Sequence, residues 1–278
     1  MRSSCRLIRI LALIAAVTFP GCMHVQLSAA NLLSPDEPPE AARLARGYAI
    51  EDFTIARADR LIGVTRAHAD GNRAVIVFCG GDRFHRSRDG GSVLAALARD
   101  ADVVLFDYPG LGSSTGTPDP DSVLDNARAV LDYVARLPTT GAQKRVLYGF
   151  SLGGMVAAQL AREGAVDGLV LEGTAPSVAS WVRSRIPWYA KPFVRVELDP
   201  LLARIDSVGA LEHFRGRVLL LAGREDTQAP VKLSRDMQKR LSAQGVRSEL
   251  HEIPHAGHGE IYRAPSFRAT LDRFVASL

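Results

Sequence analysis

One serine of this chain stands in a setting that favours nucleophilic chemistry. Ser151 is at the centre of Gly149-Phe150-Ser151-Leu152-Gly153, which follows an apolar run and precedes an amphipathic stretch. A G-x-S-x-G sequence in that setting predicts a sharp turn from a strand into a helix, with the serine hydroxyl exposed. Both outer glycines leave room, because neither brings a Cβ atom into the crowded turn. We predict that Ser151 is a nucleophile, and the alternative is a glycine-rich turn with an inert serine.

A serine hydroxyl attacks a carbonyl at neutral pH only when a base takes its proton and a carboxylate orients that base. Asp226 is the candidate carboxylate, in a polar loop after the apolar run 218–221, and Glu225 is its adjacent rival. His258 is the candidate base, because flanking glycines let its ring protrude from a loop near the end of the chain. His255, which follows a proline, is the alternative base.

The oxyanion formed at an attacked carbonyl needs backbone N–H donors that already point at it. Leu152 supplies the first donor, from the start of the helix predicted after the nucleophile. The second is predicted in the loop after the apolar run 74–79, where Gly81 is our choice and Asp82 the alternative. Cys79 ends that run, and we expect a small packed residue there rather than a reactive thiol, since no cationic group lies near it in the sequence.

Composition excludes several classes of protein. The 278 residues carry a net charge of +4, but the first nine residues hold three arginines, and without these three the net charge is +1. A nucleic-acid partner is therefore not expected, because phosphate neutralisation needs a basic excess. The three cysteines show no metal-ligand spacing. The predicted mechanism needs neither a metal nor an organic cofactor.

The body of the chain alternates strand-like and helix-like stretches, which predicts a mostly parallel sheet covered by helices on both faces. An opening antiparallel pair is expected over 50–68. The later predicted strands are 74–79, 103–106, 145–148, 168–171, 218–221 and 249–253. The predicted helices are 91–99, 121–136, 152–163, 231–244 and 265–277. Both Asp226 and His258 then follow strand ends, where the sites of such sheets gather.

A stretch at about 175–214 interrupts the alternation and predicts a small cap insertion. It holds Trp181, Trp188, Tyr189 and Phe193, with four basic residues and no acidic one from position 181 to 195. We expect these aromatic side chains to pack the cap onto the core. The alternative is an apolar and cationic rim that contacts a lipid surface.

The N-terminal segment predicts export from the cytoplasm. Three arginines precede an apolar run at 10–19, which is typical of a secretory signal over 1–21. Cys22 follows Gly21 in a sequence that resembles a bacterial lipoprotein box, so we predict lipidation at Cys22 and a tether over 22–45. The alternative is cleavage at about residue 30, which would leave a soluble periplasmic or secreted protein.

Four motifs in order make residues 48–278 resemble the α/β-hydrolase superfamily. They are the Ser151 turn, residues 107–116 as a D-x-x-G-x-G-x-S-x-G turn, residues 223–230 as an acid loop, and Gly257-His258. The similarity is greatest to serine aminopeptidase S33-like and monoacylglycerol lipase-like hydrolases, a group that includes small-capped depalmitoylase relatives. Cys79 and Pro109 stand where many members have His and Arg.

The resemblance implies one α/β-hydrolase domain over 46–278 that acts on esters, thioesters or amides. We expect a serine hydrolase of ester-type bonds that works through an acyl-enzyme on Ser151, with a small acyl compound as substrate. One alternative is a serine aminopeptidase-like enzyme that acts on short peptides. The other is a non-catalytic envelope lipoprotein that keeps the fold for binding. Membrane contact is expected through Cys22 and the cap.

Overall fold

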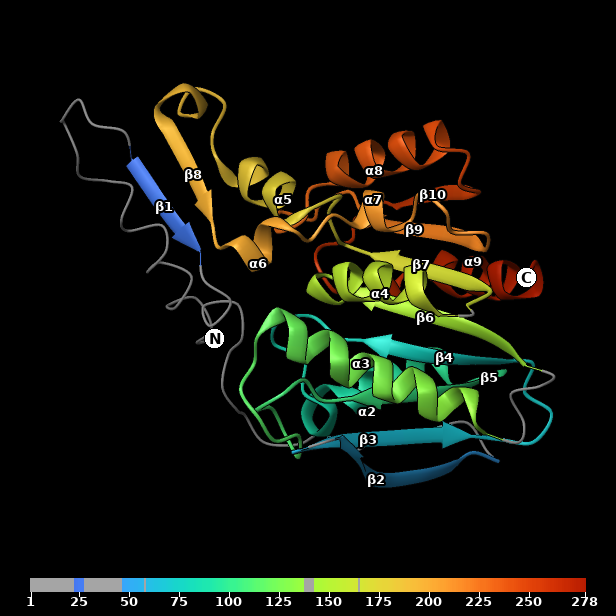
Figure 1. Ribbon diagram of the computed structural model, residues 1–278. Coiled ribbons are helices and arrows are strands. Elements are labelled where there is room, and N and C mark those ends of the chain that lie inside the picture. The colour runs from blue at the N-terminus through green and yellow to red at the C-terminus, as the bar shows by residue number, and fades with distance from the viewer. Residues whose placement is uncertain (1–22, 28–46, 58, 138–142, 165) are drawn as a thin grey trace, which may run out of the picture.

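The main sheet of the protein has eight strands and carries helices on both faces (Figure 1). The computed structural model describes residues 23–27, 47–57, 59–137, 143–164 and 166–278. The strand order is β10-β9-β7-β6-β4-β5-β3-β2. Its strands are β2 (Ala49–Arg57), β3 (Arg60–His68), β4 (Ala74–Cys79), β5 (Ala101–Phe106), β6 (Lys144–Phe150), β7 (Gly168–Glu172), β9 (Arg217–Gly223) and β10 (Ser248–Ile253).

Strand β3 alone runs against the others, since it pairs antiparallel with both β2 and β5. From β5 to β10 every pairing is parallel, so the carboxyl ends of these strands meet at one edge. The larger helices are α2 (Arg86–Leu97), α3 (Pro120–Ala135), α4 (Leu152–Glu163), α8 (Val231–Ala243) and α9 (Pro265–Ala276). The α/β class and the mostly parallel sheet predicted from the sequence are confirmed.

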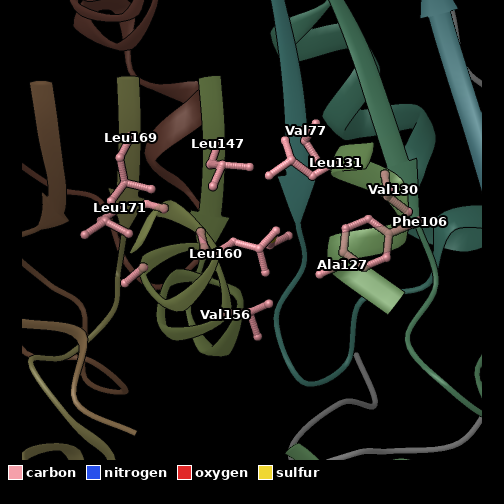
Figure 2. Packing of buried hydrophobic residues seen from close by; sticks show 14 of the residues in the cluster. Val77, Phe106, Ala127, Val130, Leu131, Leu147, Val156, Leu160, Leu169 and Leu171 are labelled. Atoms are coloured by element: carbon pink, nitrogen blue, oxygen red, sulfur yellow. The ribbon is translucent and has the colours of Figure 1, made fainter. Parts of the chain in front are cut away.

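Each face of the sheet has its own apolar core. Side chains alternate along a strand, so Leu147 of β6 points into one core and Tyr148 into the other. The first core lies beneath α3, α4 and α8, and Figure 2 shows Leu160 and Val156 of α4 and Val130 of α3 among its side chains. The second core lies beneath α2 and α9. Each fully buried leucine contributes roughly 1.5–3 kcal/mol, so both faces hold the strand ends firmly in place.

Helix α2 begins at Arg86, five residues before the predicted start at 91. Two glycines, Gly90 and Gly91, hide this start in the sequence because glycine disfavours helix. Tertiary contacts replace local propensity here: the Asp107 carboxylate accepts the Arg86 backbone N–H at 2.8 Å, and Asp89 accepts that of His85 at 2.8 Å. The start of α2 is thereby tied to the turn after β5.

The insertion between β7 and β9 forms the cap predicted at about 175–214. Its elements are α5 (Val178–Arg185), η4 (Lys191–Phe193), β8 (Val194–Leu198), α6 (Pro200–Ala203) and α7 (Ser207–Ala210). Strand β8 pairs in parallel with β1 (Met23–Leu27), and the two form a separate small sheet (Figure 1). The predicted tether over 22–45 is therefore wrong for residues 23–27, which form a strand on the cap. Cys22 and the rest of the predicted signal and tether lie outside the described residues.

The predicted packing role of the cap aromatics is right for only one of them. Trp181 lies partly buried and its indole N–H donates to the Gln228 carbonyl at 3.0 Å, which joins the cap to the loop after β9. Trp188, Tyr189 and Phe193 are instead exposed by 81%, 65% and 69%. The expectation is wrong for these three, because the turn that carries them projects away from the main sheet (Figure 1). Across the described ranges no helix is long and apolar enough to cross a membrane.

Candidate active site

Ser151 occupies a strained turn between β6 and α4, as the G-x-S-x-G pattern predicts. Its φ of 56° and ψ of −118° lie where non-glycine residues are uncommon, at a cost of about 1–3 kcal/mol. The turn is held by the Ser151 N–H, which donates to the Glu172 carbonyl at 2.9 Å. A Cβ on Gly149 would stand 2.4 Å from the Gly153 carbonyl oxygen, and one on Gly153 would stand 2.0 Å from that of Cys79. Both positions therefore require glycine.

The structure brings Ser151, His258 and Asp226 into one line of hydrogen bonds. His258 Nε2 lies 3.0 Å from Ser151 Oγ, and its Nδ1 lies 2.7 Å from Asp226 Oδ2. Asp226 Oδ1 accepts the backbone N–H groups of Gln228 at 2.8 Å and Ala229 at 2.7 Å. The aspartate is buried and the histidine nearly so. Since both carboxylate oxygens are engaged, Asp226 holds the imidazole with Nε2 toward the serine.

The two rival residues pair with each other at the surface. His255 Nδ1 lies 2.9 Å from Glu225 Oε1, and the two side chains are 90% and 62% exposed. His255 also has a φ of 56°, which belongs to the tight turn after β10. Among the described residues, neither of the two forms a hydrogen bond with Ser151. The geometry therefore favours His258 over His255 as the base and Asp226 over Glu225 as the carboxylate.

The predicted oxyanion donors lie beside the nucleophile. Leu152 is the first residue of α4, directly after Ser151. A Cβ placed on Gly81 would lie 3.4 Å from the Ser151 Cβ, and Asp82 lines the same small cavity as Ser151 and Leu152. Both Gly81 and Asp82 thus remain candidates for the second donor.

Two hydrogen bonds hold the loop that carries Gly81 in place. Tyr108 donates its hydroxyl to the Gly80 carbonyl at 2.8 Å, and Phe84 donates its N–H to the Gly81 carbonyl at 3.1 Å. Cys79 precedes this loop and is fully buried, and burial raises the pKa of its thiol to about 12. The thiol therefore stays protonated and packs as the sequence predicts.

Two residues at the end of β7 belong to the site but were missed from the sequence. Gly173 has a φ of 53°, and a Cβ there would lie 3.3 Å from both Asp226 Oδ2 and the His258 ring. Glu172 is buried, and its carboxyl accepts a hydrogen bond from the Tyr148 hydroxyl. Burial raises the pKa of Glu172 to about 7. The sequence did contain a signal for Glu172, because a charged residue there ends an apolar strand at the catalytic edge of the sheet.

Two cavities adjoin the Ser151–His258 pair. The smaller, of about 70 Å³, is lined by Ser151, Leu152, Met155 and Trp181. The larger, of about 340 Å³, is lined by His258 and Glu172. Among the residues that the structure describes, no cluster of side chains is arranged to bind a metal ion. The arrangement as a whole suits attack of a serine on a carbonyl carbon.

Comparison with known proteins agrees with the observed fold. The family described as "alpha/beta hydrolase fold" matches residues 78–195. A Pyrococcus furiosus esterase has the same fold with a TM-score of 0.67 and 16% identity, over 88% of this chain and 99% of the esterase. The chain therefore has the α/β-hydrolase fold, and residues 78–195 match that family's model. A second structure, a Pyrobaculum calidifontis esterase, matches with a TM-score of 0.61 and 18% identity over 85% of each chain.

Relatives by sequence match between somewhat more than half and nearly all of the chain. An uncharacterized protein of Mycobacterium tuberculosis is 27% identical over 262 residues, which cover 92% of this chain and 89% of the relative. The α/β-hydrolase domain-containing protein WAV2 of Arabidopsis thaliana is 26% identical over 176 residues, or 58% of this chain and 57% of WAV2. These similarities support the fold and leave the substrate open.

Proposed function

We propose that this α/β-hydrolase cleaves carboxylic esters or thioesters through a covalent acyl-enzyme on Ser151. The observation that carries the proposal is the unbroken hydrogen-bond line from Ser151 through His258 to Asp226. Such a line serves acyl transfer, since it removes the serine proton and holds the base in one tautomer. The esterases of similar fold support an ester rather than another acyl substrate.

Each residue of the site has one step in this mechanism. His258 takes the Ser151 proton as the serine oxygen attacks the acyl carbon, and Asp226 stabilises the imidazolium that forms. The N–H of Leu152, with that of Gly81 or Asp82, holds the oxyanion. His258 then gives its proton to the leaving group. Water activated by His258 attacks the acyl-enzyme and releases the acid, which regenerates Ser151.

Replacing Ser151 with alanine tests this proposal. We expect hydrolysis of p-nitrophenyl butyrate to fall by about 10³-fold or more, because only oxyanion stabilisation remains. Ser87→Ala, at an exposed serine on α2, is the matched control and should keep the wild-type rate. Wild-type hydrolysis by the Ser151→Ala protein would contradict the mechanism.

Substrate preference separates the proposal from its rivals. Acyl esters of graded chain length and short peptide amides are offered to the same purified protein. Faster cleavage of the amides would favour a serine aminopeptidase-like enzyme. A protein that hydrolysed neither class and did not react with a fluorophosphonate would be a non-catalytic binding lipoprotein.

Export and lipidation are part of the proposal and rest on the sequence alone. A signal over 1–21 followed by lipidated Cys22 would place the enzyme in the cell envelope, on a membrane. Replacing Cys22 with serine should then release the protein from the membrane fraction of the producing cell. Unchanged fractionation would count against lipidation and favour a soluble exported form.

A further inference from the structure

Glu172 lies in the candidate active site but takes no step in the proposed mechanism. Its backbone carbonyl accepts the Ser151 N–H at 2.9 Å, so the backbones of Glu172 and of the nucleophile are in direct contact. Glu172 lines the 340 Å³ cavity, which His258 also lines. In the proposed mechanism His258 delivers a proton to the leaving group. The alcohol or thiol part of a substrate would then lie in this cavity, and the acyl chain would lie in the smaller one.

The Glu172 carboxyl is a buried acid without a cationic partner. Within the described part of the chain, its one hydrogen bond comes from Tyr148, and no lysine or arginine pairs with it. A carboxylate in such a place is costly unless a positive charge joins it. Burial raises its pKa, and the nearby Asp226 adds to the rise, whereas His258 opposes it.

The walls of this cavity suit an organic cation. Its apolar lining is largely aromatic: Phe78, Phe84, Tyr148, Phe150, Tyr262 and Phe267 stand beside the aliphatic Val93, Ala96 and Leu97. Aromatic faces attract ammonium groups, above all when water is excluded. Of the other charged groups that line the cavity, Arg88 pairs with Asp89 at 2.7 Å, and Asp82 and Arg83 lie in the loop after β4. None of these supplies a positive charge to Glu172.

We propose that the cavity around Glu172 binds an ammonium group on the leaving-group side of the ester or thioester substrate. This inference rests on the proposed hydrolase function and names its substrate class. The carboxylate and the aromatic walls together would recognise the cation, and the short acyl chain would lie beneath the cap. Esters with an uncharged leaving group would still react, but they would bind more weakly than the cationic substrate.

A matched pair of thioesters tests the inference. Butyrylthiocholine carries a trimethylammonium group, and S-(3,3-dimethylbutyl) thiobutyrate has the same shape without the charge. We expect kcat/KM of the wild type to favour the cation by at least about tenfold, and the ratio to fall toward one in Glu172→Gln. Glu225→Gln, which removes an exposed carboxylate outside the cavity, is the matched control and should keep most of the preference.

Acidity provides a second readout. The preference of the wild type should grow as the pH rises through about 7, where Glu172 ionises. In Glu172→Gln the preference for the cationic substrate should not change with pH. Both substrates react through the same base, so the pH dependence of the shared chemical step cancels in the ratio.

The outcomes separate the two proposals. Hydrolysis of both thioesters with the same ratio in wild type and Glu172→Gln would overturn the cation site and leave the hydrolase intact. Loss of all hydrolysis in the wild type would overturn the hydrolase. In that case, calorimetric titration with choline still tests the cation site directly, and equal binding by wild type and Glu172→Gln would refute it.

A second inference concerns the cap tip, residues 183–195, and stands on different observations. Trp188, Tyr189 and Phe193 are exposed together on the turn before β8, and the first two rings meet edge to face with centroids 5.9 Å apart. Arg183 and Lys191 are exposed in the same segment, which holds no acidic residue. Aromatic and basic side chains in one place fit the headgroup region of an anionic membrane.

The pairing of β1 with the cap strengthens this reading. Met23 stands opposite Val194, the residue that follows Phe193. Cys22, the predicted lipidation site, is joined directly to Met23 in the chain. We infer that the cap tip docks on an anionic lipid surface and places the catalytic edge of the sheet near the membrane.

Vesicle sedimentation tests the docking without the lipid. The protein is produced from Met23, which keeps every element that the structure describes, and its fold is checked by thermal melting. It is mixed with vesicles of phosphatidylcholine alone or with phosphatidylglycerol. We expect binding to the anionic vesicles. Replacing Arg183 and Lys191 with glutamate should weaken it by at least about tenfold.

The aromatic part has its own variant and control. Alanine at Trp188, Tyr189 and Phe193 should lower binding by about tenfold or more. Serine at Ile50 and Leu61, exposed apolar residues on β2 and β3 at the far edge of the main sheet, should not. Absence of vesicle binding by the wild type, or equal binding by the aromatic variant, would overturn the inference.

Discussion

Replacing Asp226 with asparagine should stop catalysis without disturbing the fold. Asp226 Oδ1 accepts two backbone N–H groups, from Gln228 and Ala229, so the amide oxygen of asparagine keeps that position. The amide NH2 then faces His258 Nδ1 across the present 2.7 Å contact. Because an amide nitrogen donates, Nδ1 must accept, and the ring proton moves to Nε2.

The expected magnitude follows from that change of tautomer. A proton on Nε2 points at Ser151 Oγ, 3.0 Å away, so the imidazole is no longer available as a base there. Loss of the base and of the charge that stabilises the imidazolium costs about 10³ to 10⁴-fold in kcat, or about 4–5.5 kcal/mol of activation free energy. The assay is steady-state hydrolysis of p-nitrophenyl butyrate, and thermal melting monitors the fold.

Glu225→Gln is the matched control, since it removes the adjacent carboxylate. That side chain contacts exposed His255 and should change kcat less than twofold, because exposed pairs contribute about 0–1 kcal/mol. The reasoning is refuted if Asp226→Asn keeps more than about a tenth of the activity, or if Glu225→Gln is the more damaging change.

Three further predictions follow from buried groups. Glu172 has a pKa raised from 4.5 to about 7, so folding favours its protonated form; between pH 4.5 and 7 the wild type should lose roughly 3 kcal/mol of unfolding free energy that Glu172→Gln does not lose. Urea unfolding at pH 5 and pH 8 measures this, and parallel losses in the two proteins would contradict it. Cys79, buried with a pKa of about 12, should resist iodoacetamide in the folded protein and react after unfolding; rapid labelling of folded protein would show that the strand tip opens. Gly153→Ala should lower the unfolding free energy by about 3 kcal/mol or more, since the new Cβ would stand 2.0 Å from the Cys79 carbonyl oxygen, and unchanged urea unfolding would contradict that clash.

Local patterns were enough to predict the main sheet and the contacts at Ser151. Strand β4 has the predicted bounds 74–79 and helix α4 the predicted bounds 152–163, because apolar runs and periodic stretches there end at glycines or charges. The Ser151 turn depends on its own five residues. Asp226 and His258 could be chosen because both follow strand ends of a parallel sheet, and such ends converge.

Features that depend on residues far apart in the sequence could not be predicted from local patterns. Strand β1 is five residues long and exists through its pairing with β8, so nothing local distinguishes it from a tether. The role of Glu172 depends on Tyr148 of a neighbouring strand and on the cavity between α2 and the loop after β10. The exposure of Trp188 follows from how far the cap projects, which an aromatic-rich sequence does not reveal.

Covalent labelling tests the central claim most directly. The folded protein is treated with a fluorophosphonate, digested and analysed by mass spectrometry. The account predicts one adduct on the peptide that contains Ser151, which forms far more slowly in His258→Ala, because the imidazole must take the serine proton. An adduct on another residue, or ester hydrolysis by a protein in which Ser151 stays unlabelled, would contradict it.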